Sequence, residues 1–347
     1  MTNNRSDMMI KMPDCVFTEK QSSVLSHVKT WCIIPVKIVL TGGTEMESVK
    51  EEIEKLKKEK RAVILAHYYV PGEVQEIADY IGDSYFLSKK ARETDAEVIL
   101  FAGVSFMGES AKILNPERMV LLPDPQADCP MAHMASPEKI QEMRNRYEDL
   151  AVVCYINSSA RLKTLSDVCV TSSNAIDIVR KLPNKNIFFI PDGNLGAYVA
   201  AQVPEKNVIL NEGYCPVHRE ITLEDVNKAR KDHPGALLLV HPECTAEVVE
   251  KADFAGSTSE IIHFACQSEK KEFLIGTEEG VMWELEQKCP GKVFYPVKSE
   301  QCCPGMKMVT LEKVRDALKE EKYQVVLDEE TAKKARLPLD RMLELGK

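Results

Sequence analysis

Short apolar runs recur along the chain, and each is followed by polar residues and then by an amphipathic stretch. Three of these runs, VILAHYY (63–69), VVCYINSS (152–159) and LLLVHPE (237–243), begin as continuous apolar segments without polar alternation. Continuous runs are typical of strands whose two faces are both buried in a parallel sheet. Helical stretches such as 84–94 and 108–114 follow the strands. Alternating strands and helices predict an α/β fold, with helices on both sides of parallel sheets.

The same series of four strand-like runs occurs three times, and each series ends in a polar turn with the dipeptide Cys-Pro. Cys129, Cys215 and Cys303 precede these prolines at intervals of 86 and 88 residues. A fixed period of this kind indicates an internal repeat. The repeat predicts three similar three-layer α/β/α domains, in a pseudo-threefold arrangement that brings their strand ends together around one central active site.

Polar side chains occupy the ends of the predicted strands at matching positions of the three units. They are His67, Tyr155 and His241 after the first strand, and Ser84, Ser172 and Ser257 after the second. Taken singly, a serine at the start of a helix is usually an N-cap, and His67 would more often be structural than catalytic. Recurrence at equivalent positions favours a shared site, because functional residues of parallel sheets gather where the strands end.

The three Cys-Pro turns lie in polar segments, which is an unusual place for a cysteine that merely fills a core. Three thiolates from three domains suit a metal centre with one open position, either one iron of a 4Fe–4S cluster or a zinc ion. Other cysteines lie within or beside apolar segments, and we expect them to be buried thiols: Cys154, Cys169, Cys244 and Cys266. Cys289 follows a helical stretch without a repeat partner, and we expect it at the surface.

The bulk composition excludes several classes of protein. The 347 residues are 44% hydrophobic and 29% charged, with a formal net charge of −9, so the chain has no basic footprint for nucleic acid. No apolar run approaches the ~20 residues of a membrane helix. Eleven cysteines in a chain of this length do not fit a small secreted disulfide scaffold, which leaves reduced thiols, metal binding or catalysis.

Motifs spread over most of the chain resemble those of one family. ADCPMAH, YINSS, TSSNA, PDGNLGAY, GYCPVH, HPEC, GSTS, IGTEEG and CCPGMK, together with AHYYVPGEVQEIADYIGDS, look like quinolinate synthase, the iron–sulfur enzyme of bacterial and archaeal NAD biosynthesis. The resemblance runs from about residue 46 to the C-terminus. It implies a cytoplasmic enzyme that condenses iminosuccinate (iminoaspartate) with dihydroxyacetone phosphate to quinolinate, phosphate and water. It also implies a functional link to the enzyme that makes iminosuccinate from aspartate.

The family's functional residues can be carried over onto matching positions. The resemblance implies one 4Fe–4S cluster per chain, held by Cys129, Cys215 and one cysteine of CCPGMK. The family's pattern places this ligand three residues before the Met-Lys pair, so the resemblance implies Cys303 rather than Cys302. The implied catalytic residues are Tyr69, His241 and Glu243. The implied substrate contacts are His67, Ser84, Tyr155, Ile156, Asn157, Ser172, His241, Pro242, Glu243 and Thr258.

The residue types suit anionic substrates and acid–base chemistry. The matched positions contain no arginine, but Ser84, Ser172 and Thr258 are expected where helices begin, and helix N-termini attract carboxylate and phosphate. Two other interpretations stay open at this point. One is a non-catalytic iron–sulfur or zinc protein, and the other is a sugar-phosphate binding module with incidental cysteines.

The repeat also predicts the domain boundaries. Residues 1–45 lack the strand–helix rhythm and the resemblance, and we expect them to be disordered or not translated, with translation starting at Met46. The three α/β/α domains are expected at 46–136, 137–220 and 221–310, each with one Cys ligand.

The C-terminal segment, residues 311–347, is expected to pack on the first domain. Its pattern predicts a helix over 311–320, a strand over 323–327 and a last helix over 331–346.

Overall fold

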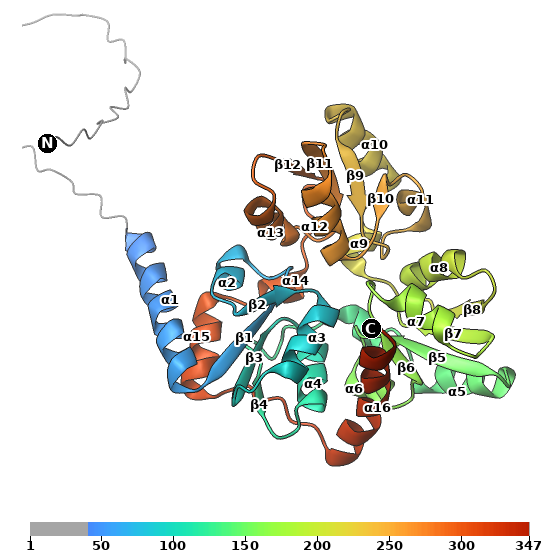
Figure 1. The fold of residues 1–347 in the computed structure, drawn as a ribbon, viewed down its shortest axis with the longest axis horizontal. Helices are drawn as coiled ribbons and strands as arrows, with labels where there is room; N and C mark the ends of the chain where they lie inside the picture. The colour runs from blue at the N-terminus through green and yellow to red at the C-terminus, as the bar shows by residue number, and fades with distance from the viewer. Residues whose placement is uncertain (1–40, 347) are drawn as a thin grey trace, which may run out of the picture. The chain divides into compact units, whose positions relative to one another are not determined.

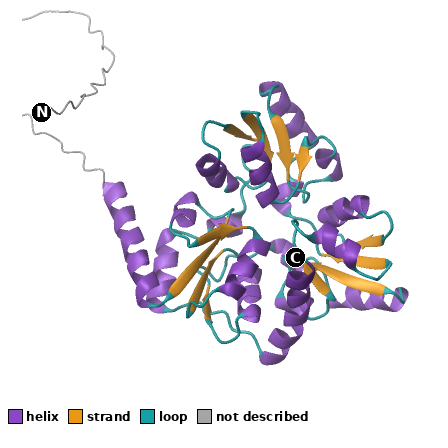
Figure 2. Ribbon diagram, viewed as in Figure 1, coloured by secondary structure: helices purple, strands orange, loops and turns teal. Residues whose placement is uncertain are grey.

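The computed structural model describes residues 41–346, which form three four-stranded sheets covered by helices (Figure 1, Figure 2). The strands are, in chain order, β1 Ala62–His67, β2 Tyr80–Gly82, β3 Val98–Ala102, β4 Met119–Leu121, β5 Leu150–Tyr155, β6 Val168–Val170, β7 Asn186–Ile190, β8 Asn207–Leu210, β9 Leu237–Val240, β10 Phe254–Ala255, β11 Glu272–Gly276 and β12 Val293–Pro296. Every sheet has its strands in the order second, first, third, fourth, and all pairings are parallel. The predicted fold class of three similar α/β/α units is therefore confirmed.

Helices alternate with the strands in each unit. The first unit contains α1 Thr41–Glu59, α2 Gly72–Glu76, α3 Ser84–Glu93, α4 Ser105–Leu114 and the 3₁₀ helix η1 Pro130–His133. The second contains α5 Pro137–Arg146, α6 Ala160–Lys163, α7 Ala175–Lys181, α8 Gly193–Gln202 and α9 Pro216–Arg219. The third contains α10 Leu223–Asp232, α11 Ala246–Val249, α12 Thr258–Gln267, α13 Val281–Lys288 and α14 Pro304–Lys307, and α15 Leu311–Glu320 and α16 Glu329–Leu345 follow. None of the described helices is long and apolar enough to span a membrane.

The amino-terminal helix α1 starts at Thr41, five residues before Met46. The predictions made for residues 1–40 lie outside the described residues. The domain boundaries predicted from the repeat stay predictions.

The third sheet illustrates why continuous apolar runs form central strands. Neighbouring side chains of β9 and β11 alternate between two separate hydrophobic clusters, one on each face of the sheet: Leu239, Phe273 and Ile275 on one face, and Leu238, Val240 and Leu274 on the other. All six are fully buried. Burial of such a side chain stabilises a fold by about 1.5–3 kcal/mol, so both faces of these strands must be apolar. The cores of the first and second sheets join into one larger cluster.

One aspartate in each unit ties the first strand to the second strand and to the preceding helix. We call Asp79, Asp167 and Asp253 the bridging aspartates; each directly precedes a second strand. Their carboxylates accept the backbone N–H of Ile64, Val152 and Leu238 at 2.8, 2.7 and 2.7 Å. They also pair with Lys57, Arg144 and Arg230 at 2.9, 3.0 and 2.9 Å. The same contact network in all three units supports the triplication inferred from the sequence.

The C-terminal segment packs more widely than predicted. Helix α15 lies against α1 of the first unit, as expected, whereas α16 lies against α6 and β6 of the second unit as well as α4 of the first. The predicted strand over 323–327 is wrong. Gln324 forms an isolated antiparallel bridge with Leu121, because this segment only covers the edge of the short strand β4.

The cysteines outside the Cys-Pro turns follow the prediction in part. Cys154, Cys169 and Cys244 are buried free thiols, as expected. The expectations for Cys266 and Cys289 are wrong, because these two residues form a disulfide and Cys289 is only 3% exposed. Helices α12 and α13 lie side by side, which brings the end of one helix next to the residue that follows the other.

Candidate active site

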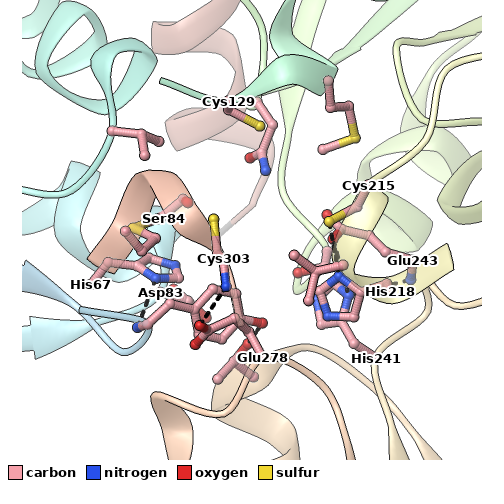
Figure 3. Close-up of a pocket in the computed structure, with 18 of the residues that line it drawn as sticks. His67, Asp83, Ser84, Cys129, Cys215, His218, His241, Glu243, Glu278 and Cys303 are labelled. Carbon is pink, nitrogen blue, oxygen red and sulfur yellow. Dashed lines mark hydrogen bonds and ion pairs between the residues drawn. The ribbon is translucent and has the colours of Figure 1, made fainter. Parts of the chain in front are cut away.

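The carboxyl-terminal ends of strands from all three sheets surround a cavity with an empty volume of about 650 Å³ (Figure 3). Most of the predicted site residues line it: His67, Tyr69, Ser84, Cys129, Tyr155, Asn157, Ser172, Cys215, His241, Glu243, Thr258 and Cys303. Ile156 and Pro242 are buried but do not line it. Alternate side chains of an extended chain point to opposite sides, which turns both away from the cavity, and their substrate contacts stay predictions.

The three Cys-Pro turns have the same local structure, and this explains why their thiols converge. Cys129, Cys215 and Cys303 are each the extended N-cap residue of a short helix that has proline as its first residue. Proline is favoured there because the first helical N–H needs no partner. All three thiols face the cavity from different sides (Figure 3), whereas Cys302 does not line it.

The electrostatic setting of these thiols suits a metal centre. Burial, together with the neighbouring Cys303 and Glu243, raises the pKa of Cys129 to about 12. Burial, Glu243 and Cys129 likewise raise the pKa of Cys215 well above its ordinary value. Three thiolates would repel one another here, so they need a bound cation or cluster to balance their charge. Thiolates are the usual ligands of iron–sulfur clusters, and the donor set therefore fits a cluster with three protein ligands.

A second donor set lies beside Cys215. Among the described residues, ligand atoms of Cys215, His218 and Glu243 lie within 4.8 Å of one another, which is a spacing that could hold a single zinc ion. His218 already uses both ring nitrogens, however. Nδ1 lies 2.8 Å from Glu243 Oε2, and Nε2 lies 2.9 Å from Thr277 Oγ1. A metal on this imidazole would break one of these contacts.

Two histidines at equivalent strand exits share one hydrogen-bond pattern. The Nδ1 atom of His67 accepts the backbone N–H of Tyr69 at 3.2 Å, and the Nδ1 atom of His241 accepts that of Glu243 at 3.3 Å. Burial lowers the pKa of both imidazoles to about 3. Each ring is therefore neutral near pH 7 and carries its proton on Nε2, which is free to donate to a ligand.

A continuous chain of hydrogen bonds joins Tyr69 to Glu243. The phenol of Tyr69 lies 2.7 Å from Thr258 Oγ1 and 2.8 Å from Thr277 Oγ1. The hydroxyl of Thr277 is hydrogen-bonded to His218, and the other ring nitrogen of His218 contacts the carboxylate of Glu243. Burial raises the pKa of Tyr69 well above its ordinary value, and the negative charge of Glu243 adds to this. Burial also favours the neutral form of Glu243, but His241 and His218 outweigh it and bring the pKa of this carboxyl below its ordinary value.

The hydroxyl groups of Ser84 and Thr258, at the starts of α3 and α12, are not used for capping. The cap positions of α3 and α12 belong to Asp83 and Ser257, whose side chains accept N–H groups of the first turn. Ser84 and Thr258 are the first helical residues, and both line the cavity. None of the described lining residues is Lys or Arg, so helix N-termini and hydroxyls are the groups that can attract an anion.

One buried polar atom in the cavity wall lacks a partner. The side-chain oxygen of Asn157 is buried and accepts no hydrogen bond within residues 41–346. Buried polar groups are nearly always hydrogen-bonded. A substrate donor is therefore expected at this atom.

Sequence reasoning missed several residues of the site, namely Asp83, Thr171, His218, Thr277 and Glu278. The reasoning followed positions shared by the three repeats, and His218 has no counterpart, because Ala132 and Met306 occupy the same position after the other two cysteines. Glu278 could have been found from the sequence, because the equivalent position after the third strand of the second unit also carries an acidic residue, Asp192.

Comparisons with known proteins agree with this geometry. Residues 51–344 match the family model described as quinolinate synthetase A protein. The chain is 54% identical over 301 residues to a quinolinate synthase of Caldicellulosiruptor bescii, covering 87% of this chain and 99% of that one. It is 52% identical to a quinolinate synthase of Fusobacterium nucleatum, covering 86% of this chain and 99% of that one. It is 48% identical to a quinolinate synthase of Pyrococcus furiosus, covering 87% and 99%. The chain belongs to the quinolinate synthase family.

Proposed function

We propose that this chain condenses iminosuccinate with dihydroxyacetone phosphate and releases quinolinate, phosphate and water. Membership of the quinolinate synthase family supports the overall reaction. The observation that carries the proposal is the convergence of three Cys-Pro turns, one from each sheet, on a cavity lined with acid–base groups and hydroxyls.

Cys129, Cys215 and Cys303 are the proposed ligands of one 4Fe–4S cluster. When bound, the cluster supplies an iron without a protein ligand, which acts as a Lewis acid toward a substrate oxygen. The protein's part is to present three thiols from three rigid units, so that no fourth thiol reaches the open position. Cys302 does not line the cavity and is the natural control for Cys303.

Tyr69 and Glu243 are proposed to move the protons of the reaction. Enolisation of the triose and loss of water each require a proton donor and an acceptor within hydrogen-bond reach. The chain from Tyr69 through Thr277 and His218 to Glu243 connects a phenol to a carboxylate. A proton taken up at one end can therefore leave at the other without solvent.

The remaining groups are proposed to hold the substrates. Ser84, Ser172 and Thr258 offer hydroxyls and nearby helix N-termini to carboxylate or phosphate. His67 and His241 offer neutral N–H donors to substrate oxygens, and Asn157 offers its unpartnered oxygen to a substrate donor. Because none of the described residues that line the cavity is Lys or Arg, these neutral donors allow anionic product to leave once it has formed.

Anaerobic reconstitution with iron and sulfide tests the proposal. We expect four irons per chain and quinolinate from the two substrates. Replacement of Cys129, Cys215 or Cys303 by alanine should abolish iron binding while the circular dichroism spectrum is unchanged, whereas Cys302→Ala should retain the iron. Equal loss of iron in Cys302→Ala and Cys303→Ala would overturn the ligand set.

Metal analysis also separates the alternative of a zinc protein without turnover, which the spacing of Cys215, His218 and Glu243 favours. That alternative predicts one zinc per chain, retained in Cys129→Ala and Cys303→Ala and lost in Cys215→Ala. A 4Fe–4S centre predicts that all three variants lose their metal together.

A further inference from the structure

A partly buried ion pair, between buried Glu278 and half-buried Lys307, holds the turn that carries Cys303. Glu278 follows β11 by two residues and has no solvent-exposed surface. Its Oε1 atom accepts the backbone N–H of Cys303 at 2.9 Å, and its Oε2 atom accepts the N–H of Gly280 at 2.6 Å. The ammonium of Lys307 lies 2.8 Å from Oε1. Figure 3 shows Glu278 beside Cys303, on the side away from the thiol.

The same ion pair reaches a residue of the first unit. Lys307 is the last residue of α14, the short helix that begins directly after Cys303. Besides Glu278, its ammonium donates to the backbone carbonyl of Tyr69 at 2.8 Å. The backbones of Cys303 in the third unit and Tyr69 in the first are thus attached to one partly buried pair of charges. Because a buried charge is costly without its partner, each member of the pair restricts the other to this position.

The equivalent positions in the other units show how far this contact recurs. The residues that follow the third strand by two positions are Val104, Asp192 and Glu278. Asp192 is also fully buried. Its Oδ1 accepts two N–H groups of α8, and its carboxylate also interacts with the backbone N–H of Cys215. Val104 has no acceptor group. The second and third units thus each place a carboxylate at the backbone of their Cys-Pro cysteine, and the ion pair with Lys307 belongs to Glu278.

We infer that Glu278, held by Lys307, is a positioning residue that fixes Cys303 and Tyr69 relative to each other. The inference rests on the proposed function, because it concerns the thiol proposed to hold the cluster. Ligands and reacting groups must be held within about 0.5 Å of their working geometry. Loss of a hydrogen bond that orients a metal ligand typically lowers metal affinity about 10- to 100-fold.

The test is the rate at which a chelator removes iron from the anaerobically loaded protein, well below its unfolding temperature. Glu278→Gln keeps the size of the side chain but removes the charge that holds Lys307. We expect it to load iron and then release it about 10- to 100-fold faster than the wild type. Glu284→Gln is the matched control, because Glu284 is also buried and pairs with Lys288 at 2.6 Å on α13, in the same unit.

Lys307→Met provides a second, independent variant, since this side chain is 24% exposed and its loss should not prevent folding. It should also release iron faster, and it should lower kcat more than it changes KM because Tyr69 loses a backbone contact. Lys307→Arg should restore much of the iron retention. The Glu278→Gln/Lys307→Met double variant should release iron no faster than Glu278→Gln alone, because the two residues act as one unit.

The possible outcomes distinguish a failure of the proposed cluster from a failure of the positioning role of Glu278. If the wild type loads no iron, the proposed cluster fails, and the positioning role fails with it. If the wild type loads four irons but Glu278→Gln and Lys307→Met release them at the rate of Glu284→Gln, the proposed function stands and the positioning role is overturned. The positioning role is supported if Glu278→Gln and Lys307→Met alone release iron faster while their unfolding temperatures are unchanged.

Discussion

The disulfide between Cys266 and Cys289 allows a stability change to be calculated from the structure. The bond joins α12 to the residue that follows α13 and closes a loop with a sequence separation of 23 residues. A cross-link of this length removes about 11 cal/mol/K of entropy from the unfolded chain, which corresponds to about 3 kcal/mol at 25 °C. Reduction should therefore lower the free energy of unfolding of the third unit by about that amount.

Trp283 provides the probe, because it lies on α13 between the two cysteines in sequence. Urea unfolding would be followed by its fluorescence in a Trp31→Phe background, with and without reductant, in protein without metal. Alkylation and mass measurement would report the state of the bond in each sample. The Cys266→Ala/Cys289→Ala variant is the control, and reductant should not change its unfolding curve.

Two results would refute this reasoning. If both cysteines are alkylated without reductant, the bond does not form in the protein. If the bond is present but the unfolding midpoint does not respond to reductant, the unfolded third unit is already compact enough that the cross-link restricts nothing further.

Three further predictions concern acid stability, the bridging aspartates and the proton-transfer chain. His67 and His241 have a pKa of about 3 in the folded protein and an ordinary value of 6.5 when unfolded, so the unfolded state binds more protons between these values. Stability should fall as the pH drops below 6.5, by about 2 kcal/mol for each histidine at pH 5; a pH-independent unfolding midpoint between pH 6.5 and 5 would contradict this. Asp253→Ala should lower the free energy of unfolding by about 1–3 kcal/mol, because the Leu238 N–H loses its acceptor, and urea unfolding of the metal-free protein measures it. Tyr69→Phe should lower kcat about 10²- to 10⁴-fold with little change in KM and no loss of iron; a larger effect on KM would make Tyr69 a binding residue.

The sequence predicted the fold well because burial on both faces of a sheet leaves a pattern that a single chain can carry. The strands around His67, Tyr155 and His241 are apolar at successive positions, and their threefold recurrence predicted three sheets. The segment over 323–327 has the same apolar character, but whether it becomes a strand depends on the length of the neighbour that it meets. That neighbour is the three-residue strand β4.

The residues of the candidate site also fall into two groups, those that the sequence could predict and those that it could not. Residues at matching positions of the three units could be found from the repeat, and most of them line the cavity. His218 and Thr277 could not, because their roles depend on a contact between the second and third units that no periodic pattern records. The Cys266–Cys289 pair escaped prediction for a similar reason, since it depends on how two neighbouring helices pack.

The three bridging aspartates have a consequence for how such a chain can diversify. Each one closes contacts inside its own unit, between a helix, a first strand and a second strand. None of these six interactions reaches a neighbouring unit. Each unit thus supplies its share of these six contacts from its own residues at this end of its sheet, while the opposite end can acquire residues that the other two units lack. An ancestral gene could in this way be copied twice and each copy then specialise at one rim alone.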